Sequence, residues 1–224
     1  MIPCVSVENM RLSDACTIAD FVPSLELMYR AAMGVFAAHH WQGRTAIVVG
    51  SGNNGGDGFA LAWILKDKGF DCTVFTVSQR LSDDSAYYAT KAKEANVPVC
   101  LFEKGCLLGF ANVVDCLLGT GFSGTVRGNY RDAIEGINES GAYVISVDIN
   151  SGMNGDTGEA ELAVRSALTV TIGFVKTGLV TENAGNYIRR LVCVDIGIVL
   201  LREEGIITEE NCPPWLDMEI IRLF

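Results

Sequence analysis

From Thr45 onward, short apolar runs alternate with segments of helical periodicity, and this alternation restricts the fold more than any other feature of the chain. Such alternation is typical of βαβ units and a parallel sheet. The expected strands are Thr45–Val49, Cys72–Val77, Val97–Phe102, Asn112–Leu118, Ala142–Asp148, Leu168–Ile172 and Leu191–Ile196. Their near-continuous Val, Ile, Leu and Cys content predicts strands buried on both faces. The expected fold is α/β: a Rossmann-like, doubly wound, mostly parallel sheet with helices on both faces, which makes three αβα layers.

The remaining segments complete one expected domain over residues 1–224. Helices are predicted at Asp57–Lys68, Asp83–Asn96 and Asn129–Glu139. Residues 1–40 are a helical preface, helical over 13–38 with Ser24 as an N-cap, and residues 45–200 are the α/β core. Residues 201–224 are a tail that docks either on the body or on a second subunit.

Composition excludes several classes of function. The net charge of −10 argues against nucleic acid and against an anionic membrane surface, because both are bound mainly through Lys and Arg. The eight cysteines include no C-x-x-C pair, and Cys72 and Cys193 lie in apolar runs, which favours buried free thiols in a reducing compartment. The start, MIPCVSVENMR, has neither a basic region nor a long apolar run, so we expect no signal peptide, no membrane span and a cytoplasmic location.

A glycine-rich loop, Gly50–Gly58, follows the first expected core strand and precedes an apolar helix. Glycines permit positive φ angles and close backbone approach, and a helix start directs free N–H groups at whatever lies above the sheet edge. An anionic ligand fits such a place. Asp57 is unfavourable beside a phosphate, so we expect it to cap the helix or to face another part of the site.

Two better-known glycine motifs fit this loop poorly. Gly50-x-Gly52-x-x-Gly55 matches the dinucleotide fingerprint, but the second strand ends Thr76-Val-Ser-Gln79, without the acid that holds ribose hydroxyls. No Lys-Ser/Thr pair follows the glycines, so a P-loop is excluded. An NAD(P)-dependent oxidoreductase remains an alternative that the missing acid disfavours.

Two later strand ends repeat the pattern of an acid followed by glycines. Asp115 precedes a loop with Gly119, Gly121 and Gly124, and Asp148 is followed by Asn150, Ser151 and Gly152. Because open parallel sheets bind ligands beyond the carboxyl ends of their strands, these ends and Gly50–Gly58 are expected to line one crevice.

The motifs NNGGDG, VDCLLGTGFSG and VDINSGMNGDTG, in this order and on these strands, resemble the NAD(P)HX epimerases, the YjeF N-terminal domain family. ENMRLSD near the start, PSLELMYRAA at 23–32 and TIGFVKTGL at 171–179 also resemble signatures of the family. The resemblance covers nearly the whole chain. It implies an enzyme, an isomerase that interconverts the R and S epimers of NADHX and NADPHX, hydrated and inactive forms of the reduced nicotinamide cofactors. It also implies functional coupling to a separate ATP- or ADP-dependent NAD(P)H-hydrate dehydratase, and a homodimer is a further possible assembly.

The resemblance also implies which residues form the site. Substrate contacts are expected from Asn53, Asn54, Gly55, Gly56, Asp57, Gly119, Thr120, Gly121, Phe122, Ser123, Gly124, Thr125 and Asp148. A potassium ion is expected at Asn54, Asp115 and Ser151, which supply only oxygen ligands of the kind that hard cations prefer. Three positions depart from the family pattern: Asn150 and Thr177 stand where proline is usual and Ala32 where glycine is common.

Epimerisation requires the C–OH bond of the hydrated ring to be broken and remade on either face. The ring nitrogen can expel the hydroxyl to leave an iminium ion, and ring opening to an aldehyde is a chemical alternative. Asp148, an acid at a strand end, is the expected general acid–base residue. A non-catalytic nucleotide-binding or scaffolding member of the family is the remaining alternative, and the presence of Asn54, Asp57, Asp115 and Asp148 argues against it.

Overall fold

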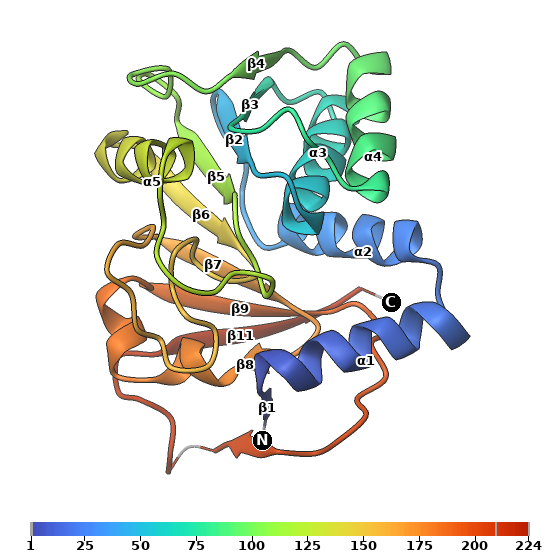
Figure 1. The fold of residues 1–224 in the computed structure, drawn as a ribbon, viewed down its shortest axis with the longest axis vertical. Helices are drawn as coiled ribbons and strands as arrows, with labels where there is room; N and C mark the ends of the chain where they lie inside the picture. Colours follow the sequence, from blue (N-terminus) through green and yellow to red (C-terminus); the bar gives the residue numbers. More distant parts are fainter. Residues whose placement is uncertain (1, 209, 224) are drawn as a thin grey trace.

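The computed structural model describes residues 2–208 and 210–223. Its centre is an eight-stranded sheet in the order β11-β9-β7-β6-β5-β2-β3-β4, and all neighbouring strands are parallel (Figure 1). Strand β2 (Thr45–Val49) has β3 (Cys72–Thr76) and β4 (Val99–Leu101) on one side and β5 (Asn112–Cys116) on the other. The direction of winding therefore reverses between β2 and β5, as in the Rossmann order. The predicted doubly wound parallel sheet is confirmed.

The other strands of this sheet are β6 (Tyr143–Val147), β7 (Leu168–Ile172), β9 (Arg190–Asp195) and β11 (Asp217–Arg222). Every residue of β2, β5 and β7 is buried, which explains their uninterrupted apolar sequence. The prediction of burial on both faces is wrong for β4, whose three residues are all exposed because it is the last strand at one edge.

Helices cover both faces of the sheet, as predicted. α2 (Ser24–Ala37), α3 (Asn53–Asp67) and α4 (Asp83–Glu94) pack on one face, and α5 (Asn129–Glu139) packs on the other (Figure 1). None of the helices in the described ranges has the length and apolar character needed to span a bilayer.

The first 40 residues differ from the single helical stretch expected there. They form β1 (Ile2–Val5), α1 (Val7–Asp20) and α2. Helix α1 ends before Pro23, as expected because proline disfavours helical backbone at the residue before it. Ser24 was predicted to be an N-cap, which is wrong: Pro23 holds that position without a side-chain cap, and Ser24 is the first helical residue.

The tail docks on the body of the same chain. Strand β11 adds to the edge of the large sheet beside β9, and β10 (Gly205–Ile207) joins β1 and β8 (Val175–Lys176) in a small second sheet. Two short 3-10 helices, Thr177–Val180 and Asn183–Asn186, connect β8 to β9. β1, β8 and β10 have only two to four residues, too few to carry a periodic signal, and the sequence analysis predicted neither these strands nor β11.

A stripe of polar side chains attaches α1 to the extended segment that precedes β10. Asn9 Nδ2 donates to the carbonyl oxygen of Arg202 at 2.7 Å. The backbone N–H groups of Leu201 and Val199 donate to Ser13 Oγ at 3.1 Å and to Thr17 Oγ1 at 2.9 Å. These three side chains are four residues apart and buried, so one face of α1 satisfies the backbone of the tail segment.

This stripe generates a prediction about stability. Thr17→Val keeps the shape of the side chain but leaves the partly buried N–H of Val199 without its acceptor, and we expect a loss of about 0.5–1.5 kcal/mol in the free energy of unfolding. The matched control is Thr90→Val, because Thr90 likewise donates to a carbonyl four residues earlier but is exposed and accepts no such bond. Urea unfolding measures both, and equal effects would contradict this role of Thr17.

Candidate active site

The loops after β2 and β5 touch at the point where the winding reverses. The N–H of Gly50 donates to the carbonyl oxygen of Cys116 at 3.0 Å, and a Cβ at Gly50 would lie 2.0 Å from the carbonyl oxygen of Leu117. Gly58 is equally confined, with a Cβ there 2.7 Å from Val49 and 2.9 Å from Cys116. Only glycine permits this approach, which brings the two loops together.

Helix α3 begins at Asn53, four residues before the predicted start at Asp57. Gly55 and Gly56 lie inside its first turns because there is no room for side chains: a Cβ would lie 2.4 Å from the Gly50 carbonyl oxygen or 2.6 Å from Met28. None of the glycines in Gly50–Gly58 has positive φ, so close approach, and not left-handed backbone, explains them. Gly52 is the N-cap and offers no side chain, so the first N–H groups of α3 are open to a ligand.

Asp115, buried at the end of β5, accepts four hydrogen bonds. The donors are Ser146 Oγ at 2.9 Å, Leu117 N at 3.2 Å, and the backbone N and Oγ of Ser151 at 3.0 and 2.5 Å. Burial raises the pKa of Asp115, and these bonds oppose that rise. Ser151 Oγ also accepts from the N–H of Leu118 at 2.9 Å, so Asp115 and Ser151 fasten the loop after β5 to the loop after β6.

Asn54 joins the same cluster. Its Nδ2 donates to the carbonyl oxygen of Leu118 at 3.0 Å, and its Oδ1 is buried with no hydrogen-bond partner among the described residues. A buried amide oxygen without a donor is costly. Together with Asp115 and Ser151 it forms a donor set of oxygens only, which fits a hard monovalent cation. The described residues contain no group of three or more His, Cys, Asp or Glu side chains suited to a metal.

Asp148 follows β6 and forms a buried ion pair. Its Oδ1 lies 2.5 Å from Nζ of Lys176, whose side chain is only 1% exposed, and its Oδ2 accepts from the N–H of Thr120 at 3.2 Å. Lys176 Nζ also donates to Ile172 O at 2.7 Å and Thr171 Oγ1 at 3.2 Å. Asp148 has a φ of 68°, and apart from Asn96 it is the one non-glycine in the described chain with positive φ. Unusual backbone held by buried hydrogen bonds is characteristic of functional positions.

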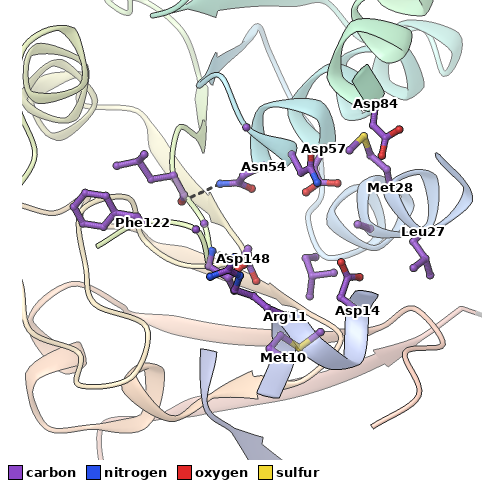
Figure 2. Close-up of a pocket in the computed structure, with 18 of the residues that line it drawn as sticks. Met10, Arg11, Asp14, Leu27, Met28, Asn54, Asp57, Asp84, Phe122 and Asp148 are labelled. Atoms are coloured by element: carbon purple, nitrogen blue, oxygen red, sulfur yellow. Dashed lines mark hydrogen bonds between the residues drawn. The ribbon is translucent and has the colours of Figure 1, made fainter. Parts of the chain in front are cut away.

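Asn54, Asp148 and Lys176 line one cavity of about 620 Å³, within the usual range for small-molecule sites, whereas the fully buried Asp115 and Ser151 do not line it. Figure 2 shows that its walls come from several elements, with Asn54 and Asp57 on α3, Asp148 after β6, and Met10, Arg11 and Asp14 on α1. The cavity reaches nine of the expected substrate-binding residues: Asn53, Asn54, Asp57, Gly119, Thr120, Gly121, Phe122, Ser123 and Asp148. Gly55, Gly56 and Thr125 do not line it, and Gly124 lies at a smaller neighbouring cavity of about 300 Å³.

Of the two roles expected for Asp57, the structure agrees with the second: the side chain faces this cavity and does not cap α3. It lies one turn inside the helix and receives no hydrogen bond from the described residues. Burial, followed by the carboxylates of Asp148 and Asp14, raises the pKa of Asp57 well above its usual value. Asp14, on α1, has its pKa raised by burial and by Asp148, while Lys176 lowers it.

Comparison with known proteins identifies the family to which this site belongs. The family model described as "YjeF-related protein N-terminus" matches residues 24–178. The chain belongs to this family. An NAD(P)H-hydrate epimerase of Limosilactobacillus fermentum is 36% identical over 85% of the chain and 95% of its own length.

Two further relatives extend the comparison. A bifunctional NAD(P)H-hydrate repair enzyme of Coxiella burnetii is 35% identical over 92% of the chain, which spans only 44% of that longer protein. The crystal structure of yeast ynu0 superposes with a TM-score of 0.70 at 22% identity, covering 83% of this chain and 86% of the yeast chain. At that identity the superposition supports the fold alone.

Two of the three departures of this YjeF-related domain from the family pattern, Asn150 and Thr177, form hydrogen bonds, and the third, Ala32, is packed in the core. Asn150 is buried, donates from Nδ2 to Val164 O at 2.9 Å and to Ser166 Oγ at 3.0 Å, and accepts from Thr169 Oγ1 at 2.6 Å. Thr177 Oγ1 donates to the carbonyl oxygen of Asp156 at 3.2 Å. Proline would restrict φ at these two positions. Here the hydrogen bonds of Asn150 and Thr177 hold the two segments instead.

Several residues of the site were missed from the sequence. Lys176 lies within TIGFVKTGL and Asp14 within ENMRLSD, two segments noted as signatures without a role for either residue. Tyr130, whose hydroxyl accepts from the N–H of Ser51 at 3.1 Å, has no motif around it. A charged residue inside an otherwise apolar strand-like run was the available signal for Lys176.

The ion pair generates a prediction about stability. Removing either charge leaves the other buried without its partner, so Lys176→Met and Asp148→Asn should each lower the free energy of unfolding by about 3–5 kcal/mol. Asparagine tolerates positive φ, so the backbone adds little to the second loss. The double variant should lose less than the sum, as measured by urea unfolding. The exposed pair Arg131–Glu135 is the control, expected to be worth less than about 1 kcal/mol, and additive losses at Lys176 and Asp148 would contradict coupling.

Proposed function

We propose that this protein is an NAD(P)H-hydrate epimerase, an isomerase that interconverts the R and S epimers of NADHX and NADPHX. The observation that carries the proposal is the buried Lys176–Asp148 pair on the wall of a cavity lined by residues that follow β2, β5 and β6. Relatives of similar length carry the name NAD(P)H-hydrate epimerase, including proteins of Limosilactobacillus fermentum and Limosilactobacillus reuteri.

The charge distribution orients the ligand. The start of α3 offers N–H groups at the positive end of a helix dipole, which favours the pyrophosphate there. Asp14 on α1, Asp148 after β6 and Asp57, one turn further into α3, also line the cavity, and their carboxylates would repel phosphates. The hydrated nicotinamide ring therefore lies toward Asp148, and an iminium formed on it is stabilised by the surrounding carboxylates.

Asp148 performs proton transfer at the ring hydroxyl. The Lys176 ammonium and the Thr120 N–H hold its two oxygens in a fixed orientation. A carboxyl group in this place protonates the departing hydroxyl, and its carboxylate takes the proton from the water that adds to the iminium. Lys176 remains bound to Asp148, Thr171 and Ile172, so it serves as a positioning residue.

A potassium ion held by Asn54, Asp115 and Ser151 completes the proposal. When bound, the ion would place positive charge beside the buried Asp115 and would be coordinated by the otherwise unpaired Asn54 Oδ1. Asn54, Asp115 and Ser151 then fix the loops after β2, β5 and β6 relative to one another. We further propose that a separate dehydratase consumes one of the epimers. We also propose that the protein is a homodimer and is located in the cytoplasm. The Coxiella relative, named as a bifunctional repair enzyme, supports a link between the two activities.

The first functional prediction concerns Asp148. Asp148→Asn, assayed below its unfolding temperature, should slow epimer exchange by about 10²–10⁴, the usual contribution of general acid–base catalysis. Purified S-NADHX is incubated with the protein and the epimers are separated by chiral chromatography. Asp132→Asn on the exposed face of α5 is the control. A folded, ligand-binding Asp148→Asn with the parent's rate would overturn the role of Asp148.

The second functional prediction concerns potassium. A ligand that binds only the folded state stabilises it, by about 2.7 kcal/mol at a hundred times its Kd. Thermal unfolding in potassium chloride should therefore occur at a higher temperature than in lithium chloride of equal ionic strength. Asn54→Leu should abolish the difference and the exposed control Asn183→Leu should keep it. If the parent unfolds at the same temperature in both salts, the cation assignment is wrong.

A further inference from the structure

Asp57 lines the cavity, and the proposed mechanism assigns it no proton transfer. Figure 2 shows Asp57 on α3 and Asp148 beyond β6, on different walls of the same cavity, with space for a ligand between them. Asp57 is held in place by its neighbours in α3, because Gly56 and Gly58 on either side pack tightly against Met28 and Cys116. Its position across the cavity from Asp148 is therefore fixed by the fold.

The carboxyl group of Asp57 has no structural task that explains it. It caps no helix, and among the described residues it forms no hydrogen bond or ion pair. Asp115, by contrast, is fully buried and accepts four hydrogen bonds. Asp57 is partly exposed, and it is the cavity that exposes it, so its carboxyl group is available to whatever occupies the cavity.

The charged groups around Asp57 favour its neutral, proton-donating form. Negative charge on nearby carboxylates disfavours the ionised form of Asp57, and these carboxylates are Asp14 on α1, Asp84 on α4 and Asp148. Its other titratable neighbours are Tyr88 and Cys116. Lys176 is the nearby cation, and its ammonium is already bonded to Asp148. The pKa of Asp57 is accordingly well above its usual value, first through burial and then through these carboxylates.

We propose that Asp57 is a second acid–base residue of the epimerase and acts on the face of the hydrated ring opposite to the face that Asp148 serves. The inference rests on the proposed function. Inversion needs the hydroxyl to leave from one face of the ring and water to add to the other. A single carboxyl group on one wall serves both faces poorly. Two acids on different walls supply a donor on one side and an acceptor on the other.

The step balances with water as the only co-reactant. The Asp57 carboxylic acid donates its proton to the hydroxyl, the C–O electron pair leaves with the oxygen as water, and the ring nitrogen lone pair forms the C=N bond of the iminium. A second water then adds from the other face: its oxygen forms the new C–O bond, the C=N π pair returns to nitrogen, and its proton passes to the Asp148 carboxylate. The enzyme ends as Asp57 carboxylate and Asp148 acid, which is the starting state for the opposite epimer and is reset by proton exchange with solvent.

The test compares oxygen exchange with inversion in water enriched in ¹⁸O. Each purified epimer of NADHX is incubated with Asp57→Asn, which is nearly isosteric. Chiral chromatography with mass spectrometry gives the ¹⁸O content and the epimer ratio, after subtraction of the uncatalysed rate. The epimer whose hydroxyl faces Asp148 should still lose that hydroxyl and gain a new one from water on the same side. Its ratio of ¹⁸O exchange to inversion should therefore be at least tenfold higher in Asp57→Asn than in the parent protein. Inversion itself should slow by about 10²–10⁴.

Two variants control this result. Asp67→Asn removes the same charge at the exposed end of the same helix and should match the parent. Asp148→Asn should produce the reciprocal bias, with exchange retained by the other epimer. A merely structural or binding role for Asp57 lowers exchange and inversion together, so an unchanged ratio for both epimers in Asp57→Asn overturns the inference. If the parent inverts neither epimer, the proposed function fails instead.

Discussion

The backbone of Gly50 passes so close to Leu117 that a Cβ at Gly50 would lie 2.0 Å from its carbonyl oxygen, and the site is arranged around this approach. It sets the distance between the ends of β2 and β5, where the winding of the sheet reverses. From there Asn54 reaches Leu118, and Ser151 binds both Leu118 and Asp115. Gly119 extends the same constraint, because a Cβ there would lie 2.9 Å from Asp148 Oδ2. A chain with side chains at these glycines would keep the alternation of strands and helices but lose the convergence of its loops.

The three aspartates near this point differ in the hydrogen bonds and ion pairs that they form. Asp115 is supplied with hydrogen bonds, so it fastens loops, and Asp148 is paired with Lys176, so it is held in one orientation. Asp57 has neither, and the helix that carries it begins with an N-cap that has no side chain. Stability alone would favour a neutral, hydrogen-bonded residue at 57. The carboxyl group retained there lines the cavity on a different wall from Asp148 (Figure 2).

What the sequence reveals about this fold depends on whether a feature is local. The apolar runs and the glycines at their ends are local, so the seven core strands and the convergence of the loops followed from the pattern, whereas the cavity residues on those loops were named from the family resemblance. The start of α3 did not, because Gly55 and Gly56 have low helix propensity and are tolerated only where α2, α4 and the Gly50 loop press against them. Lys176 was missed for a related reason. Its ammonium is buried by partners 4, 5 and 28 residues away, which no spacing rule in one sequence connects.

The wall formed by α1 shows how a site can depend on segments outside the region that the family model matches. Met10, Asp14 and Ile18 lie on the cavity side of α1 at intervals of four residues, and Asn9, Ser13 and Thr17 lie on the adjacent side, bonded to the tail segment. One helix therefore presents two stripes, one to the ligand and one to the backbone before β10. Because hydrogen bonds to the tail hold it more than apolar packing does, the position of Asp14 beside Asp57 and Asp148 depends on residues 199–202. The charge balance of the cavity is thus set jointly by the sheet, by α1 and by a segment almost 200 residues away in the sequence.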